Sequence, residues 1–461
     1  MIKSFFKLKW LDRLSPVQII SLGFMMIILL GSLLLTLPIS SATHTTTNYI
    51  DALFTATTSV CVTGLVTVTT MLHWSAFGKF VILCLIQIGG LGFMTAVSLI
   101  FSIFNMRMSV KNKLTTQSSL NERGLNRLGI SVKRVVLGTF IIEAIGAVFI
   151  TISLLKDYPF IQAIKYGIFT SISAFCNAGL DIFSTNSLAR FSDNGLLLWS
   201  VMILIVIGGI GFPIWWEVLS IFRRLIIKKI KWHNIKNTLS LHFKIVVITT
   251  SILIFAGFIC TLIFEYTNTS TIGNMGILDK INNSFFQSIT LRTAGFSSVN
   301  QANLTESTKF ISMIFMFIGG SPGSTAGGIK TVTFALIIIM LGTWIRNNKY
   351  AVTHKRIVPE EYIKRSFLIA FLSMAILFIA ILILTRTESA DITTVSFECI
   401  SAIATVGLSL DFTSNLTEIG KIIIIWLMFM GRIGPITLFM SMKKEGKKVE
   451  IRFPDEKVLL G

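Results

Sequence analysis

The sequence has few charged residues and few residues that break a helix. Only 14% of its 461 residues are charged and only eight are proline, whereas 53% are hydrophobic and 37 are phenylalanine. Several uncharged apolar runs reach the roughly 20 residues that a membrane-spanning helix requires. This composition excludes a soluble enzyme or a collagen-like chain and predicts an integral membrane protein.

Residues that carry catalytic or metal chemistry are also scarce. The five cysteines include no C-x-x-C pair, the five histidines have no ligand spacing, and no Walker motif is present. Neither a carboxylate cluster nor a His-acid pair recurs. We therefore expect no enzyme activity, no metal centre of the zinc type and no nucleotide bound by this chain. The cysteines, which lie in or beside apolar segments and suit packing roles, are Cys61, Cys84, Cys176, Cys260 and Cys399.

Acidic residues are outnumbered, with 22 against 41 basic residues and a net charge of +19. Five patches hold 30 of the basic and eight of the acidic residues, a net charge of +22, and the rest of the chain carries −3. The positive-inside rule places these patches and both termini in the cytoplasm, so the charge indicates orientation in the cell membrane and not affinity for nucleic acid. Solvated anchors near anionic lipid and a docking surface for a cytosolic partner both remain open. The patches are residues 3–13, 107–134, 223–244, 346–365 and 443–457.

Between successive patches the chain repeats one pattern four times. An apolar run is followed by a polar turn, a shorter semi-apolar segment that ends at a glycine, and a second apolar run. The glycines are spaced by 115, 116 and 112 residues. Each is followed 24 to 29 residues later by a second glycine cluster. The first motifs are Val62-Thr63-Gly64-Leu65, Asn177-Ala178-Gly179-Leu180, Thr293-Ala294-Gly295-Phe296 and Thr405-Val406-Gly407-Leu408. The second are Gly89-Gly90-Leu91-Gly92-Phe93, Gly208-Gly209-Ile210-Gly211-Phe212, Gly319-Gly320-Ser321-Pro322-Gly323 and Gly431-Arg432-Ile433-Gly434-Pro435.

The short segment in each repeat is too short to cross a membrane. About 11 helical residues span roughly 16 Å, which predicts re-entrant half-helices at residues 50–60, 165–176, 282–291 and 393–403. Loops at membrane depth are tolerated only inside protein or around a wet cavity, so four of them predict one shared central pore. The predicted fold is an all-α membrane protein with four pseudo-fourfold M1-P-M2 repeats (helix, re-entrant pore loop, helix), that is, eight transmembrane helices plus four pore half-helices.

The repeats also define the expected segments of the chain. Repeats 1 to 4 are expected at residues 17–106, 135–226, 245–346 and 366–442. Cytoplasmic segments are expected at residues 1–16, 107–134, 227–244, 347–365 and 443–461.

The ends of the half-helices favour a cation. Each half-helix points its carbonyl end, which carries a partial negative charge, at the axis. The glycine that follows permits backbone conformations that turn carbonyl oxygens inward, where they can replace the hydration shell of an ion. The neighbouring side chains are small and neutral, which favours a monovalent alkali cation over calcium or an anion.

These T-x-G-type loops in four M1-P-M2 units resemble the Trk/Ktr/HKT family of potassium transporters, and the length most resembles its KtrB-type ion-translocating subunits. The resemblance implies potassium uptake, with potassium or alternatively sodium held at the filter glycines Gly64, Gly179, Gly295 and Gly407. The single glycine per loop departs from the T-V-G-Y-G channel filter. The implied filter is Val62, Thr63, Gly64, Asn177, Ala178, Gly179, Thr293, Ala294, Gly295, Thr405, Val406 and Gly407.

The third returning segment, residues 307–345, is too long for one crossing helix and contains five glycines and a proline in ten residues. Such a stretch cannot remain a regular helix, and its hydroxyl groups would be costly in lipid. One interpretation is a kinked packing helix, and the other is a flexible loop beneath the filter. The resemblance implies the second, an intramembrane gate loop at 319–331 made of Gly319, Gly320, Ser321, Pro322, Gly323, Ser324, Thr325, Ala326, Gly327, Gly328 and Lys330.

Arg432 occupies the position where the other repeats have Gly90, Gly209 and Gly320. An arginine in mid-membrane costs about 2.5 to 3.5 kcal/mol or more, so its side chain should face water, the pore or a carboxylate. We expect a pore-facing charge that belongs to the gate, with a structural ion pair as the alternative. Arg292 and Glu398 are expected to pair behind the filter.

The resemblance also implies partners. KtrB-type subunits form homodimers and sit on a cytosolic ring of RCK-type regulatory subunits that bind ATP or ADP and resemble KtrA, so the C-terminal tail is a candidate for either contact. An ion-coupled symporter driven by sodium or protons is an alternative. A membrane-embedded transferase is a more distant one.

Overall fold

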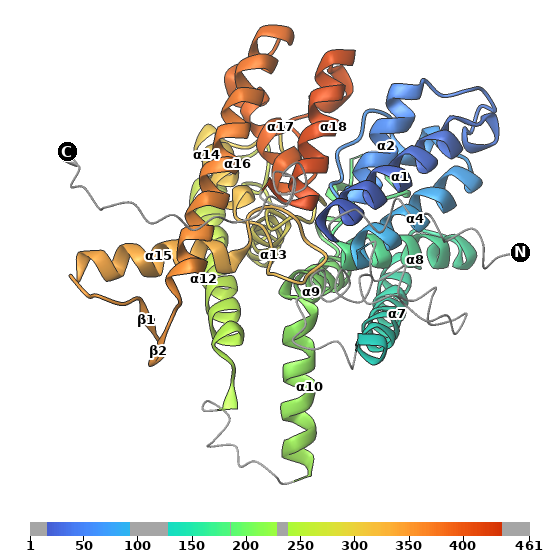
Figure 1. Cartoon of the computed structure of the whole chain (residues 1–461). Coiled ribbons are helices and arrows are strands. Elements are labelled where there is room, and N and C mark those ends of the chain that lie inside the picture. The colour runs from blue at the N-terminus through green and yellow to red at the C-terminus, as the bar shows by residue number, and fades with distance from the viewer. Residues whose placement is uncertain (1–15, 93–127, 185, 228–237, 436–461) are drawn as a thin grey trace, which may run out of the picture.

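The computed structural model describes residues 16–92, 128–184, 186–227 and 238–435 (Figure 1). These residues are mostly helical with almost no strand, and the predicted fold class of four M1-P-M2 repeats is confirmed. The predicted N-terminal segment and tail, and most of the linkers at 107–134 and 227–244, lie outside the described residues. The exact repeat boundaries therefore stay predictions.

Each repeat begins with a long outer helix. These four helices are long and apolar enough to cross a membrane. They expose large apolar side chains on the outside, such as Phe371 and Leu382, which are 71% and 72% exposed. Such exposure suits a surface in contact with lipid. The outer helices are α1 (Pro16–Thr36), α7 (Leu128–Leu154), α12 (Leu241–Glu265) and α16 (Glu360–Thr387).

The pore helices follow the outer helices. Two have side-chain caps at their N-termini, where Asn48 accepts from the Ile50 amide and Asp391 accepts from the Thr394 amide. The second and third helices begin five residues earlier than predicted, at Phe160 and Ile277. The pore helices are α2 (Tyr49–Cys61), α8 (Phe160–Cys176), α13 (Ile277–Thr290) and α17 (Ile392–Ala404).

The returning runs are divided into shorter helices, which the sequence predicts only for the third repeat. In the second repeat the returning run bends by 97° at Gly211, where φ is +100°. Beyond the bend it continues as α10 (Phe212–Ile226) (Figure 1). In the third repeat, residues 318–330 form a loop between α14 (Glu306–Phe317) and α15 (Thr331–Ile345). The others are α4 (Ala76–Leu91), α9 (Gly195–Ile210) and α18 (Glu418–Ile433). Short elements complete the described chain: η2 (Pro38–Ser40), α3 (Thr70–His73), η4 (Ala189–Phe191), η6 (Thr413–Asn415) and the hairpin of β1 (Val352–Thr353) with β2 (Arg356–Ile357).

The second glycine cluster has a packing role that explains its recurrence. A Cβ atom added at Gly89, Gly208 or Gly431 would collide with a backbone carbonyl near the end of the pore helix of the same repeat. Those carbonyls belong to Val60, Phe175 and Ile403, each four residues before the filter glycine. Glycine is required there because the returning helix touches the pore helix backbone.

Two buried glutamates tie the outer helices to the returning helices. Glu265 at the end of α12 accepts hydrogen bonds from the amide and the hydroxyl of Thr305, at 2.9 and 2.8 Å. Glu388, just after α16, accepts from the same two groups of Thr417. Thr305 and Thr417 are the N-caps of α14 and α18, where a carboxylate also suits the positive end of the helix dipole.

The repeats form a closed ring. The returning helix of each repeat packs against the pore helix of the next, in the pairs α4 with α8, α9 with α13 and α14 with α17. The ring closes where α18 of the last repeat packs against α2 of the first, so segments from the two ends of the chain lie side by side (Figure 1). At this junction Lys421 donates to Asp51 at 2.7 Å, and both side chains are 16% exposed. Burial lowers the pKa of nearby His73, and the carboxylate of Asp51 opposes this shift.

Replacement of Lys421 by alanine is expected to weaken this closure. The substitution leaves Asp51 with little solvent and no partner, which should cost about 1–3 kcal/mol, between the values for exposed and fully buried pairs. Thermal unfolding of the purified protein in detergent measures the loss. The exposed pair Glu360–Lys364 is the matched control, because Lys364→Ala should leave the midpoint unchanged. Equal midpoints for both variants would contradict a closing role for the Lys421–Asp51 pair.

Candidate pore and gate loop

The four filter glycines meet at the centre of the ring. A Cβ atom added at Gly64 would lie 2.7 Å from the carbonyl oxygen of Ala178. At Gly179 it would lie 2.7 Å from the Ala294 oxygen, and at Gly295 2.6 Å from the Val406 oxygen. At Gly407 it would collide with the oxygen of Thr63. Each glycine therefore faces the carbonyl of the next loop, in the order 1, 2, 3, 4 and back to 1.

The loop backbone has the same unusual conformation in every repeat. The residue two positions before the glycine is left-handed in each, with φ of +57° at Val62, +62° at Asn177, +69° at Thr293 and +52° at Thr405. The glycines themselves have φ between +65° and +103°. Left-handed β-branched residues are rare and strained by about 1–3 kcal/mol, so the surrounding protein must impose this shape.

Hydroxyl groups from the pore helices help to impose it. Six residues before the glycine, Thr58 accepts from the Gly64 amide at 2.9 Å and Ser401 accepts from the Gly407 amide at 3.0 Å. Ser173 at the same position accepts from the Leu180 amide at 3.0 Å. The third repeat has Ile289 there, and the next residue, Thr290, bonds the loop instead. Sequence analysis missed these residues, although a hydroxyl recurs at one spacing in three repeats.

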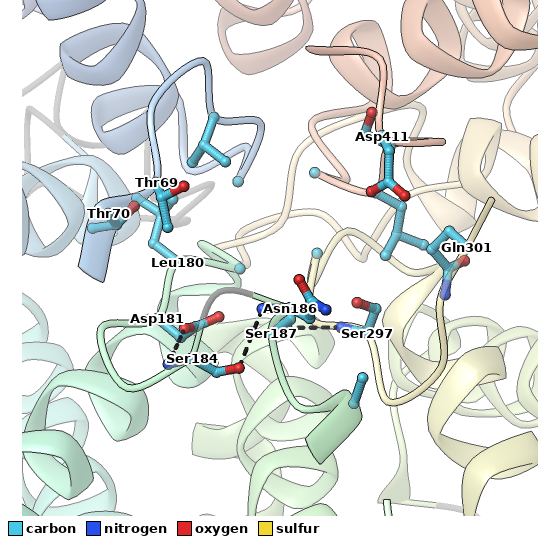
Figure 2. Close-up of a pocket in the computed structure, with 18 of the residues that line it drawn as sticks. Thr69, Thr70, Leu180, Asp181, Ser184, Asn186, Ser187, Ser297, Gln301 and Asp411 are labelled. Carbon is cyan, nitrogen blue, oxygen red and sulfur yellow. Dashed lines mark hydrogen bonds between the residues drawn. The ribbon is translucent and has the colours of Figure 1, made fainter. Parts of the chain in front are cut away.

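A cavity of about 370 Å³ opens onto the four glycines. Residues of all four repeats line it, and it includes the carboxylates of Asp181 and Asp411 but no lysine or arginine within the described chain (Figure 2). Its rim is tied together across repeats, because the Leu188 amide donates to the Ser297 carbonyl at 2.9 Å and the Ser297 amide to the Ser187 hydroxyl at 3.1 Å. A polar cavity with two acidic residues favours cations over anions at its floor, although burial raises the pKa of Asp181 to about 7.

The loop of residues 318–330 contacts the inner ends of the pore helices. Its Thr325 hydroxyl donates to the Phe175 carbonyl of α8 at 3.1 Å. Gly327 and Gly328 leave room for Thr405 and Ala404 at the end of α17. The amides of Ser321 and Thr325 donate to the last carbonyls of α9, at Gly209 and Gly208. The predicted gate residues thus lie together against the second and fourth repeats, and the loop is well bonded in this conformation.

Two basic side chains hold the loop. Arg432 donates to the Thr325 carbonyl and to the carbonyls of Gly89 and Gly90 at the end of α4, so it links the loop to the first repeat. Lys330 donates to the carbonyls of Ala326 at 2.6 Å and Gly327 at 3.3 Å. Among the described residues Arg432 forms no salt bridge, so its charge is compensated by carbonyl oxygens and not by a carboxylate.

The expected pairing of Arg292 with Glu398 is wrong. Glu398 accepts hydrogen bonds from the hydroxyls of Ser409 and Thr413, which hold the fourth filter loop. Arg292 instead donates to the Gly319 carbonyl at 3.4 Å. Spacing along the chain could not reveal this, because the Gly319 carbonyl comes within reach of Arg292 only in the folded protein.

Metal ligands do not cluster in the part of the chain that the structure describes, where no three His, Cys, Asp or Glu side chains come together. All five cysteines are free. The groups that converge at the centre are backbone carbonyls and glycines, and carbonyl oxygens are typical ligands of alkali cations.

Fold and site together define a class: a multi-pass membrane transport protein in which four repeats surround one pore. The chain belongs to the TrkH family of cation transport proteins, whose family model matches residues 13–450. It is 36% identical to the potassium/sodium uptake protein NtpJ of Enterococcus hirae, over 97% of this chain and 98% of that protein. It is 37% identical to the Ktr system potassium uptake protein B of Bacillus subtilis, over 98% of both chains.

A solved structure shows the same fold. The potassium transporter TrkH from Vibrio parahaemolyticus aligns with a TM-score of 0.68 and 16% identity, covering 91% of this chain and 84% of that one. The predicted family is therefore confirmed, and the chain is a transport protein and not an enzyme.

Proposed function

We propose that this chain takes up potassium through the central pore, with the carbonyl oxygens of Thr63, Ala178, Ala294 and Val406 as ion ligands. The observation that carries the proposal is the cyclic contact of each filter glycine with the carbonyl of the next loop. The twelve filter residues named above form this ring, and their own side chains are uncharged. Carbonyl rings of this kind replace the hydration shell of an alkali cation.

The loop of residues 318–330 acts as the gate in this proposal, with Lys330 and Arg432 as its basic residues. It lies against the inner ends of two pore helices, α8 and α17, and is held by Arg432, so an ion leaving the filter must pass it. The loop contains five glycines, and glycine permits several backbone conformations. Once its hydrogen bonds break, the loop can therefore be displaced as a unit.

Orientation and partners follow from charge and from the relatives. The five basic patches favour cytoplasmic termini and a cytoplasmic docking surface. The relative in Bacillus subtilis is a component of a Ktr system, which supports a partner subunit. We expect a homodimer on a nucleotide-binding RCK ring, with no nucleotide bound by this chain itself.

Uptake measurements test the proposal. Cells that lack potassium uptake should grow at low potassium when this chain is expressed, and more so with a co-expressed RCK subunit. In vesicles, potassium and rubidium flux should follow their own gradients and the voltage. A reversal potential that depends on sodium would instead favour a coupled symporter. The name of the Enterococcus relative, a potassium/sodium uptake protein, is consistent with this alternative. If neither the chain nor the pair moves potassium or rubidium, the proposal fails.

A further inference from the structure

One position behind the filter differs in charge between the repeats. Three residues before the filter glycine stand Cys61, Cys176, Arg292 and Ala404. Only the third repeat has a charged group there, and it is the repeat whose returning helix is interrupted by the gate loop. Arg292 is therefore the residue that distinguishes the third repeat at this position.

The Arg292 side chain joins the filter loop to the start of the gate loop. It is only 7% exposed, and its guanidinium donates to the Gly319 carbonyl at 3.4 Å. The next residue in the chain is Thr293, which is left-handed in the filter. On the other side, the Gly319 amide donates to the Ile329 carbonyl at 2.8 Å and so joins the two ends of the gate loop. One side chain therefore spans from the third filter loop to the base of the gate.

A small cavity lies beside this link. Arg292 and Thr250 of α12 line it together with Gly209 and Gly320, and its volume is about 10 Å³. Within the described chain, the Nη1 atom of Arg292 and the Oγ1 atom of Thr250 are buried without a hydrogen-bond partner. A buried polar group without a partner is costly, and a cavity of this size fits one water molecule.

We propose that Arg292 is a positioning residue that couples the gate loop to the third filter loop, directly through Gly319 and through one buried water shared with Thr250. The inference rests on the proposed function of the pore. When the gate loop moves, the guanidinium loses its carbonyl partner and no longer fixes Thr293. Ion selectivity and opening are then linked, because one group supports both loops.

The test compares rubidium and sodium flux in vesicles for Arg292→Gln, Arg292→Lys and Thr250→Val. Arg292→Gln should lower the rubidium-to-sodium flux ratio by about tenfold, since a hydrogen bond to a charged group is lost. Arg292→Lys, which keeps the charge, should restore part of the ratio. Thr250→Val should lower it by a smaller factor, and Thr250→Ser, which keeps the hydroxyl, should match the wild type.

A double variant separates coupling from simple destabilisation. In Arg432→Ala, where the gate loop has already lost a support, the added Arg292→Gln should change the flux ratio much less than it does alone. Additive effects, or an unchanged ratio in Arg292→Gln protein that elutes as the wild type does from a sizing column, would overturn the inference. If Arg292→Gln does not fold, the Thr250→Val and Thr250→Ser pair decides it. A wild type that moves neither ion overturns the proposed function and this inference together.

Discussion

Replacement of Gly295 by serine is expected to reduce rubidium uptake by at least about tenfold while the protein still inserts in the membrane. The added Cβ atom would lie 2.6 Å from the Val406 carbonyl oxygen and 3.0 Å from the Cα atom of Gly179. Both neighbours are backbone atoms of other filter loops, which cannot rotate away as a side chain would. The glycine also has φ of +80°, and a left-handed conformation costs serine about 1–2 kcal/mol. Carbonyl oxygens must therefore leave the ring that we propose to bind the ion.

The same variant should change selectivity as well as rate. A displaced Val406 carbonyl widens the ring on one side, so the residual flux should favour sodium more than the wild type does. Flux of rubidium and of sodium in vesicles, at equal protein content, measures both quantities.

A second glycine provides the matched control. Gly342 lies in α15, and a Cβ atom added there would meet nothing within 4 Å. The Gly342→Ser variant should therefore transport as the wild type does. This result would exclude a general effect of replacing a glycine by serine in an apolar segment. Wild-type flux and selectivity in Gly295→Ser would remove the filter assignment.

Replacement of Arg432 by alanine is expected to increase cation flux by about tenfold or more. The guanidinium bonds the gate loop at Thr325 to the end of α4 at Gly89 and Gly90, and it is the only described side chain that joins the loop to the first repeat through such bonds. Hydrogen bonds to a charged group contribute about 1.5–3 kcal/mol each, and 1.4 kcal/mol is a factor of ten in an equilibrium. Loss of the arginine also removes a positive charge that opposes a passing cation.

Two further variants distinguish these causes. Arg432→Lys keeps the charge but loses the forked geometry that reaches both partners, so its flux should lie between the wild type and Arg432→Ala. Arg386→Ala removes an exposed arginine at the end of α16 and should leave flux unchanged. Unchanged flux in Arg432→Ala, measured in vesicles with the wild type in parallel, would show that this side chain does not restrain the gate.

Recurrent spacing made the centre of this protein accessible to sequence analysis. Glycines such as Gly64 and Gly407 are fixed by backbone geometry, and a Cβ atom collides with another loop at each of them, so the same residue recurs at the same place. The second cluster recurs for a similar reason, because glycines such as Gly89 touch a pore helix carbonyl. Local steric demands of this kind leave a pattern that can be read without coordinates.

Individual side-chain ion pairs and hydrogen bonds between repeats could not be read in the same way. Each occurs once and joins residues far apart in the chain, as Lys421 and Asp51 do, so no spacing marks it. The bend at Gly211 was missed because the apolar run continues through it. Hydrophobicity alone does not distinguish one straight helix from two helices that meet at an angle of 97°.

By itself, the sequence determined that the chain is an all-α membrane protein of four repeats with a glycine at the heart of each, because composition and repeated steric requirements are properties of the chain alone. Only the tertiary structure decided where the few intramembrane charges go. Arg432 and Arg292 are both held by backbone carbonyls of the gate loop, since folding brings those carbonyls, and no carboxylate of the described residues, within reach.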